Sequence, residues 1–240
     1  MLTVAGETLL KLATAHGRAV SVHLYGQEVN PETFAISKAD LILKGEGNEA
    51  DNMKFGSTLS VDAFPSREFD FMLSNPPYGK SWKTDLERMG GKKDLRDSRF
   101  IVDHAGDPAF SLITRSSDGQ MMFLANMLSK MKKASPLGSR IAEVHNGSAL
   151  FTGDAGSGES NIRRWIIEND WLEAIIALPL NIFYNTGIAT YIWVLSNRKA
   201  DSRKGKVQLI DATSWFKPLR KNLGKKNCEL APDDIKRICD

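Results

Sequence analysis

The sequence predicts an α/β fold whose sheet is mostly parallel. Short apolar runs alternate along the chain with longer segments in which apolar residues recur at helical spacing. Two late apolar runs, residues 172–178 and 190–195, are separated only by a loop, which favours an antiparallel pair at one edge of the sheet. No internal repeat or low-complexity tract interrupts the pattern.

The first predicted elements are two helices with a strand between them. Helical spacing predicts a helix over residues 2–15, and alternation of apolar and polar residues predicts a strand over 19–25, followed by a turn at 26–28. The pair Asn30-Pro31 is a favourable helix start, because the asparagine caps free N–H groups and proline lacks one. We expect this second helix to run to Lys44.

The later elements follow the same alternation. In chain order they are a strand over 69–74, a helix over 119–133, a strand over 140–150, a helix over 161–169, and strands over 172–178, 190–195 and 207–210. Residues 82–107 are different, since they are rich in Lys, Arg, Asp and Gly and have few apolar anchors. We predict a long mobile loop or an insertion there, and loops of that length are often functional.

Composition excludes several classes of protein. The 240 residues are 42% hydrophobic and 25% charged, close to an average soluble globular protein. No apolar run approaches a membrane span, and the N-terminus lacks the pattern of a secretory signal. Cys228 and Cys239 fit neither a disulfide scaffold nor a zinc site, and the histidines show no metal-ligand spacing. We expect a cytoplasmic protein without a metal site.

Basic residues are concentrated in one segment. Residues 198–226 contain ten lysines and arginines against two aspartates, on a body that is otherwise mildly acidic. Such a segment suits a phosphate backbone or an acidic partner, and a merely solvated C-terminal region is the alternative.

The most specific motif is the tetrapeptide Asn75-Pro76-Pro77-Tyr78, directly after the predicted strand at 69–74. Two prolines make a stiff turn at the carboxyl end of a strand, where α/β sheets bind their ligands. The Asn75 side chain and the Pro76 backbone each offer a carbonyl oxygen to one exocyclic amino group. A purely structural turn is the alternative.

These residue types suit one particular reaction. The N6 atom of adenine is a poor nucleophile, because its lone pair is delocalised into the ring. Two converging acceptors localise that pair and stabilise the positive charge that grows on N6 as it attacks a methyl group. The aromatic face of Tyr78 offers a stacking surface for an extruded base.

Glu28 is a second candidate site residue. An acidic residue at the tip of a strand is suited to bind both hydroxyls of a ribose. Taken alone, an exposed glutamate in a turn is the commoner explanation, and its place about 50 residues before the tetrapeptide strand favours the binding role.

Four stretches of the sequence resemble the modification (methyltransferase) subunit of type I DNA restriction-modification systems. They span most of residues 24–197 and read YGQEVNPETFAISKADLILKG, FDFMLSNPPYGKSWK, DGQMMFLANMLSKMK and RIAEVHNGSALFTGDAGSGESNIRRWIIENDWLEAIIALPLNIFYNTGIATYIWVLSN. The resemblance implies a Rossmann-like S-adenosylmethionine-dependent sheet with helices on both faces. It also implies methyl transfer from S-adenosylmethionine to N6 of adenine in DNA.

The resemblance assigns roles to individual residues. It implies that Asn75, Pro76, Pro77 and Tyr78 form the catalytic loop, with Asn75 also at the cofactor. It implies that Glu28 binds the cofactor ribose and that the region around Ser57 lies near the cofactor adenine. Related methyltransferases commonly have an aspartate at the position of Ser57.

One feature of the family is missing from the sequence. Its members have an Asp-Pro-x-x-Gly-[Ser/Thr]-Gly-Gly loop after the first, central strand, and no such loop precedes Leu2. We therefore expect an N-terminally truncated chain without the first strand, in which the second and fourth strands each expose an unpaired edge. We expect S-adenosylmethionine to bind this chain weakly or not at all. The expected domains are a methyltransferase core over 1–197 and a basic C-terminal extension over 198–240.

The resemblance also implies partners. A separate specificity subunit chooses the DNA sequence, and a restriction subunit completes the nuclease. We expect DNA, both of these subunits and a second copy of the modification subunit as partners, and no membrane. Two alternatives stay open: a protein-glutamine methyltransferase whose substrate amide is held by the same tetrapeptide, and a non-catalytic remnant or assembly module of such a system.

Overall fold

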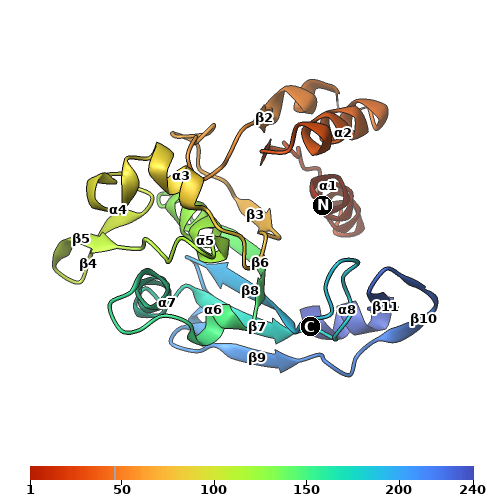
Figure 1. Cartoon of the computed structure of the whole chain (residues 1–240). Helices are drawn as coiled ribbons and strands as arrows, with labels where there is room; N and C mark the ends of the chain where they lie inside the picture. The colour runs from red at the N-terminus through yellow and green to blue at the C-terminus, as the bar shows by residue number, and fades with distance from the viewer. Residues whose placement is uncertain (46) are drawn as a thin grey trace. The chain divides into compact units, whose positions relative to one another are not determined.

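The structure is a computed structural model that describes residues 1–45 and 47–240. The chain divides into two compact units, Met1–Arg67 and Glu68–Asp240 (Figure 1). The domain boundary that we predict at residue 197 falls inside the second unit and stays a prediction.

The Met1–Arg67 unit contains two α-helices and a small parallel sheet. Its elements are α1 (Leu2–Ala15), β1 (Gly26–Glu28), α2 (Pro31–Leu43), the 3-10 helix η1 (Gly47–Asn52) and β2 (Met53–Phe55). Both predicted helices are confirmed, and the Asn30 side chain caps α2 by accepting a hydrogen bond from the Thr33 N–H at 2.9 Å. The core of the unit comprises Leu24, Leu41, Ala50 and Met53.

The strand predicted at 19–25 is wrong, because the strand lies at Gly26–Glu28, where we predict a turn. The N–H of Leu24 donates to the Glu49 carboxylate at 2.9 Å instead of to a neighbouring strand. Pairing with β2 selects the later residues. Gly26 leaves room for the Met53 side chain, because a Cβ there would lie 2.6 Å from the Met53 Cε atom.

The Glu68–Asp240 unit is built on a five-stranded mixed sheet in the order β3-β6-β8-β7-β9. The strands are β3 (Phe71–Ser74), β6 (Arg140–Asn146), β7 (Leu172–Ala177), β8 (Thr190–Ser196) and β9 (Gln208–Asp211). β3 and β6 are parallel, as are β7 and β9, whereas β8 is antiparallel to both of its neighbours. The predicted antiparallel pairing of the two late strands is confirmed in direction. Its place differs, because β9 adds outside that pair and forms the edge.

Helices cover both faces of this sheet, as predicted. They are α5 (Gln120–Ser129), α6 (Ser148–Phe151), α7 (Gly158–Glu168) and α8 (Pro232–Cys239). Trp193 and Val194 are neighbours on β8 and therefore point to opposite faces. Trp193 contacts the His145 ring on the face of α5, whereas Val194 packs in the cluster that includes Ile238 of α8.

The prediction of a mobile loop at 82–107 is wrong. The segment contains α3 (Lys83–Arg88), α4 (Gly91–Asp94), β4 (Ile101–His104) and the start of β5 (Asp107–Ser111). Four widely spaced apolar side chains anchor it in the unit: Trp82, Leu86, Leu95 and Phe100 are all buried. Sparse anchors are enough when each one is buried almost completely.

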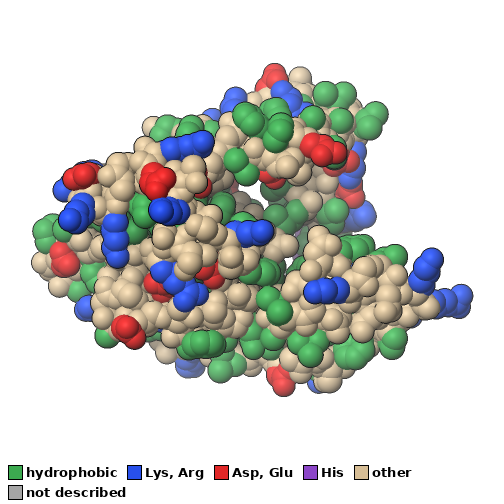
Figure 2. All heavy atoms as spheres, in the orientation of Figure 1, with side chains coloured by type: hydrophobic (Ala, Val, Ile, Leu, Met, Phe, Trp, Pro, Cys, Tyr) green, Lys and Arg blue, Asp and Glu red, His purple; other side chains and the backbone are tan. Residues whose placement is uncertain are grey.

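The C-terminal residues continue the second unit. After the short 3-10 helix η2 (Asp201–Arg203) and β9, an antiparallel hairpin forms from β10 (Lys217–Leu223) and β11 (Lys226–Glu229). Figure 2 shows charged side chains of both signs interspersed with apolar ones on the visible face. Among residues 1–45 and 47–240, no helix is long and apolar enough to cross a membrane.

Candidate active site

Several loops of the second unit leave its sheet at one rim. Because β3, β6, β7 and β9 run in the same direction, their carboxyl ends share a rim with the start of the reversed strand β8. The tetrapeptide at 75–78 follows β3 there, and residues 147–152, 178–189 and 212–216 follow the neighbouring strands. This is the rim where α/β sheets bind ligands.

The tetrapeptide lies on this rim directly after β3, as the sequence predicts. Asn75 and Pro77 are exposed, whereas Pro76 is buried and Tyr78 is half-buried. The Tyr78 hydroxyl donates a hydrogen bond to Asn75 Oδ1 at 2.7 Å. The two ends of the tetrapeptide therefore contact each other and close a compact turn.

The environment of Tyr78 keeps its hydroxyl protonated. Burial, with a smaller contribution from the negative charge of Glu143, raises the pKa of Tyr78 to about 12. The hydroxyl is thus a hydrogen-bond donor at neutral pH, and Asn75 Oδ1 is its acceptor. One lone pair of this oxygen remains for a second donor.

The segment after the tetrapeptide is held by a second anchor. The buried Trp82 donates from Nε1 to the Arg115 carbonyl at 2.9 Å, and its backbone N–H donates to the Ser116 carbonyl at 2.9 Å. Gly119 allows this contact, because a Cβ there would lie 3.2 Å from the Trp82 side chain. The loop is therefore held between β3 on one side and the 115–119 turn on the other.

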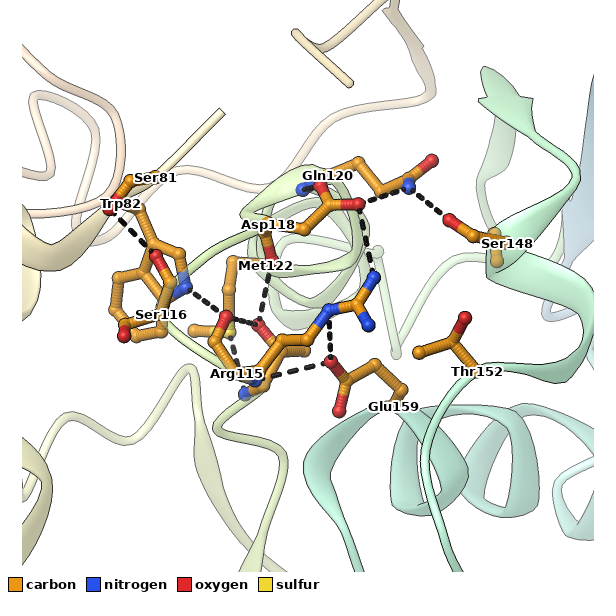
Figure 3. A network of polar contacts seen from close by, with 12 residues as sticks. Ser81, Trp82, Arg115, Ser116, Asp118, Gln120, Met122, Ser148, Thr152 and Glu159 are labelled. Atoms are coloured by element: carbon orange, nitrogen blue, oxygen red, sulfur yellow. Dashed lines mark hydrogen bonds and ion pairs between the residues drawn. The ribbon is translucent and has the colours of Figure 1, made fainter. Parts of the chain in front are cut away.

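A polar network continues from this turn along the rim (Figure 3). Arg115 lies between two buried carboxylates, at 3.7 Å from both Asp118 and Glu159, and the Glu159 carboxylate also accepts its backbone N–H at 3.1 Å. Gln120 Nε2 donates to Asp118 at 2.9 Å and to Ser148 Oγ at 3.1 Å. The cavity among these residues measures about 10 Å³ and is too small for an organic ligand. We interpret the network as structural: its hydrogen bonds and ion pairs hold the loops of this rim together.

A buried acid–base pair lies behind the tetrapeptide on β6. Glu143 is paired in register with Ser74, the residue before Asn75. Glu143 and His145 are both completely buried, and Glu143 Oε2 lies 3.1 Å from His145 Nε2. His145 Nδ1 lies 3.2 Å from Gln120 Oε1 and is the donor in that contact, because the amide oxygen can only accept. The pair thus links the polar network to the strand ends beneath the tetrapeptide.

The two predicted cofactor residues of the first unit lie at one end of its sheet. Glu28 is the last residue of β1, and its carbonyl accepts the Gly56 N–H at 3.0 Å, one residue before Ser57. Glu28 Oε1 accepts the Asn30 N–H at 2.7 Å, while Ser57 is half-buried. The structure therefore brings Glu28 and Ser57 together at the carboxyl ends of two parallel strands. The tetrapeptide belongs to the other unit.

Sequence reasoning missed the polar network and the buried pair. Asp118 accepts the Gln120 N–H at 3.2 Å, which in a sequence looks like an ordinary helix cap. Glu143 and His145 alternate on an apolar strand, and this spacing is their only sequence signal. Two charged or polar residues on the inward face of a buried strand are rare enough to indicate a special site.

Comparisons with known proteins agree on one family. A model of the family described as N-6 DNA Methylase matches residues 4–240. The chain is 29% identical over 217 residues to the type I restriction enzyme MjaIX methylase subunit of Methanocaldococcus jannaschii, covering 90% of this chain and 35% of that protein. It is 27% identical over 246 residues to the MpnII methylase subunit of Mycoplasma pneumoniae, covering 98% of this chain and 41% of that protein.

A solved structure gives the same result. The type I restriction-modification methyltransferase subunit from Streptococcus thermophilus matches with a TM-score of 0.72 and 27% identity, covering 98% of this chain and 44% of that one. The chain spans less than half the length of each of these three relatives.

Proposed function

Because this chain belongs to the N-6 DNA methylase family, we propose that it is the catalytic part of a type I modification subunit. The proposed reaction transfers a methyl group from S-adenosylmethionine to N6 of adenine in DNA. The observation that carries the proposal is the place of the tetrapeptide, which follows β3 at the ligand-binding rim with Asn75 exposed.

The proposed chemistry uses groups that this loop presents. Asn75 Oδ1 and the Pro76 carbonyl accept the two N6 hydrogens and so stabilise the positive charge that develops on N6 during the attack. Asn75 Oδ1 already accepts one hydrogen bond from the Tyr78 hydroxyl. The N6 amino group therefore either donates to the second lone pair of this oxygen or displaces the hydroxyl. The Tyr78 ring stacks on the extruded base. The transfer would replace one N6 hydrogen by the methyl group, with S-adenosylhomocysteine as the other product and the N6 proton passing to water.

The residues of the first unit fit the cofactor that the family implies. S-adenosylmethionine supplies the methyl group when it is bound. A ribose diol needs an acceptor near a strand end, and Glu28 offers Oε2 there while Oε1 is held by the Asn30 N–H. The hydrogen bond from the Gly56 N–H to the Glu28 carbonyl holds Ser57 close to Glu28. The Ser57 hydroxyl can bind the adenine ring of the cofactor.

The proposal extends to the partners of the subunit. The matched relatives are named as methylase subunits of type I restriction enzymes. By analogy we propose that this chain works with DNA, a specificity subunit, a restriction subunit and a second copy of the modification subunit. We also propose a cytoplasmic location, where the DNA substrate is.

Exchange of the key acceptor tests the proposal. Asn75→Ala is expected to lower the rate of methyl transfer by a factor of about 100 to 1,000, because one of the two acceptors for N6 is lost. Its affinity for S-adenosylmethionine should stay nearly unchanged. The assay follows tritiated methyl groups into DNA and, in parallel, into protein. The matched control is Asn48→Ala, which removes an exposed asparagine of the first unit.

Three results would contradict the proposal. Unchanged turnover in Asn75→Ala would remove the assigned role of the tetrapeptide. Label in protein but not in DNA would favour a glutamine substrate. A wild-type chain that transfers no methyl group, even with a specificity subunit added and with S-adenosylmethionine at a concentration that saturates weak binding, would favour an assembly module.

A further inference from the structure

A basic hairpin leaves the sheet at the same rim as the tetrapeptide. We call the β10–β11 hairpin, residues 217–229, the basic ribbon. It follows β9, whose last residue Asp211 is paired with Ala177 at the end of β7. The Ala212 N–H then donates to the Ala177 carbonyl at 3.0 Å, so the connection to the ribbon begins at this rim.

The basic ribbon is attached to the loop at 178–189 along its second strand. The Lys225 N–H donates to the Tyr184 carbonyl at 2.9 Å, and the Asn227 N–H donates to the Asn181 carbonyl at 3.1 Å. Backbone hydrogen bonds therefore join the hairpin to the loop at 178–189, which also leaves the sheet at this rim. These hydrogen bonds fix the position of the ribbon in the second unit.

Two further contacts support this attachment. Lys226 Nζ donates to the Ile182 carbonyl at 2.9 Å and lies 5.7 Å from the centre of the Tyr184 ring. Gly224, at φ +63°, comes so close that a Cβ would lie 2.7 Å from the Tyr184 carbonyl oxygen. Lys226 is thus a structural cation, unlike the other cations of the ribbon.

Four cations of the basic ribbon remain available to a partner. Lys217, Arg220, Lys221 and Lys225 are all exposed, and in the described part of the chain none forms an ion pair with an acidic side chain. Glu229 is the single acidic residue of the ribbon. Figure 2 shows lysine or arginine side chains projecting where Figure 1 places the β10–β11 tip.

A pocket of about 560 Å³ opens at the base of the ribbon. The amide side chains of Asn181, Asn222 and Asn227 line it. The other lining residues are Thr213 and the apolar Leu180, Phe216, Pro218 and Leu219. Amides donate and accept hydrogen bonds, so they suit the sugars, phosphates and base edges of a nucleic acid. Together with the exposed cations, these amides give the ribbon both the charge and the hydrogen-bonding groups that a nucleic-acid backbone requires.

The structure divides the basic segment at 198–226 into two parts at opposite rims. Residues 198–206 connect the end of β8 to the start of β9, at the rim away from the tetrapeptide. The five cations there already have partners. Lys199 lies 2.6 Å from Asp170 and Lys204 lies 2.6 Å from Asp201, whereas Arg198, Arg203 and Lys206 donate hydrogen bonds to nearby carbonyl or amide oxygens. In the described part of the chain, the cations of the segment that have neither an ion pair nor a side-chain hydrogen bond all belong to the basic ribbon.

We propose that the basic ribbon binds the backbone of duplex DNA beside the base that the tetrapeptide receives, with Lys217, Arg220, Lys221 and Lys225 as the phosphate contacts. This inference rests on the proposed function, because a tetrapeptide that takes a base from DNA requires the flanking duplex to lie along the same rim. Phosphates spaced along a duplex suit a row of exposed cations on a ribbon that is fixed in place.

Two charge-matched double variants of the full chain test the proposal. Lys221→Gln with Lys225→Gln removes two ribbon cations, and Lys204→Gln with Lys206→Gln removes two cations at the opposite rim. Affinity for a short fluorescein-labelled DNA duplex is measured by anisotropy over a series of salt concentrations, without cofactor. The ribbon variant should bind about tenfold more weakly and lower the slope of log affinity against log salt by about 2, because two phosphate contacts are lost. The control should bind nearly as the wild type does.

Each other outcome overturns the proposal. Equal losses in both variants would mean that only net charge matters. Unchanged DNA binding in the ribbon variant, with weaker binding to a specificity subunit, would assign the ribbon to an acidic protein surface. The proposed function is tested separately, since Asn75→Ala changes methyl transfer whereas this assay involves no turnover.

Discussion

The two units of the chain hold their predicted site residues in different ways. In the Met1–Arg67 unit, Glu28 ends a strand of three residues in a two-stranded sheet. In the Glu68–Asp240 unit, the tetrapeptide follows an outer strand of a five-stranded sheet and is held again at Trp82. The proposed catalytic loop therefore has a much larger scaffold than the proposed cofactor residues.

The cores of the two units explain this difference. The first unit has a small cluster around Leu41 and Met53. The second buries many large side chains completely, among them Phe100, Leu124 and Ile166. Because the free energy of unfolding grows with buried apolar area, we expect the first unit to be the less stable one.

The largest expected effect comes from cutting into each core separately. Leu41→Ala and Leu124→Ala each remove a side chain that is at most 2% exposed, and each should lower the free energy of unfolding of its own unit by about 3 kcal/mol. All five tryptophans lie in the second unit, so tryptophan fluorescence reports on that unit alone. Far-UV circular dichroism reports on the helices of both.

The comparison predicts different urea curves for the two variants. Leu41→Ala should move part of the circular dichroism transition to lower urea and leave the fluorescence transition in place. Leu124→Ala should move the fluorescence transition. If Leu41→Ala shifts both signals equally, the two units unfold together, and the expectation that the first unit is less stable than the second is wrong.

A smaller effect is expected at the proposed cofactor residue. Glu28→Gln keeps an oxygen that accepts the Asn30 N–H but removes the charge, so affinity for S-adenosylmethionine should fall about tenfold, or about 1.4 kcal/mol. Ligand-observed NMR suits the weak binding that we expect. Glu32→Gln, an exposed glutamate in the first turn of α2, is the matched control. Equal losses in both variants would exclude a specific role for Glu28.

The smallest effect concerns the pH dependence of the second unit. The pKa of Tyr78 is raised from its ordinary value of 10.0 to about 12, so the fold favours the protonated hydroxyl. This contribution is complete below pH 10 and is lost as pH rises from 10 to 12, by about 1 kcal/mol after allowance for solvent screening. Tyr78→Phe should therefore flatten the decline of stability in this range.

Urea unfolding followed by tryptophan fluorescence, repeated at several pH values, measures this change. Tyr184→Phe is the control, because its hydroxyl group belongs to an exposed side chain. If the two variants decline with the same slope as the wild type, folding does not raise the pKa of Tyr78.

The sequence alone was sufficient for features that depend on local patterns. The α2 start at Asn30, the strands of the five-stranded sheet and the tetrapeptide after β3 follow from capping, periodicity and proline chemistry within a few residues. The prediction of a strand at 19–25 is wrong, because the position of a strand depends on its partner, and β2 pairs with Gly26–Glu28. The prediction of a mobile loop at 82–107 is wrong, because Trp82 and Phe100 are buried by residues that are distant in the sequence.

Composition and local pattern thus determined the α/β class, the tetrapeptide and the excess of basic residues near the C-terminus. Only the tertiary structure placed Glu143 and His145 behind the tetrapeptide and Arg115 between Asp118 and Glu159. It also separated the basic segment into a part whose cations are bonded to nearby groups and a ribbon with four exposed cations, at opposite rims of the sheet. The reason is physical: spacing along the chain determines what a residue can do locally, whereas strand order and direction decide which distant residues it meets.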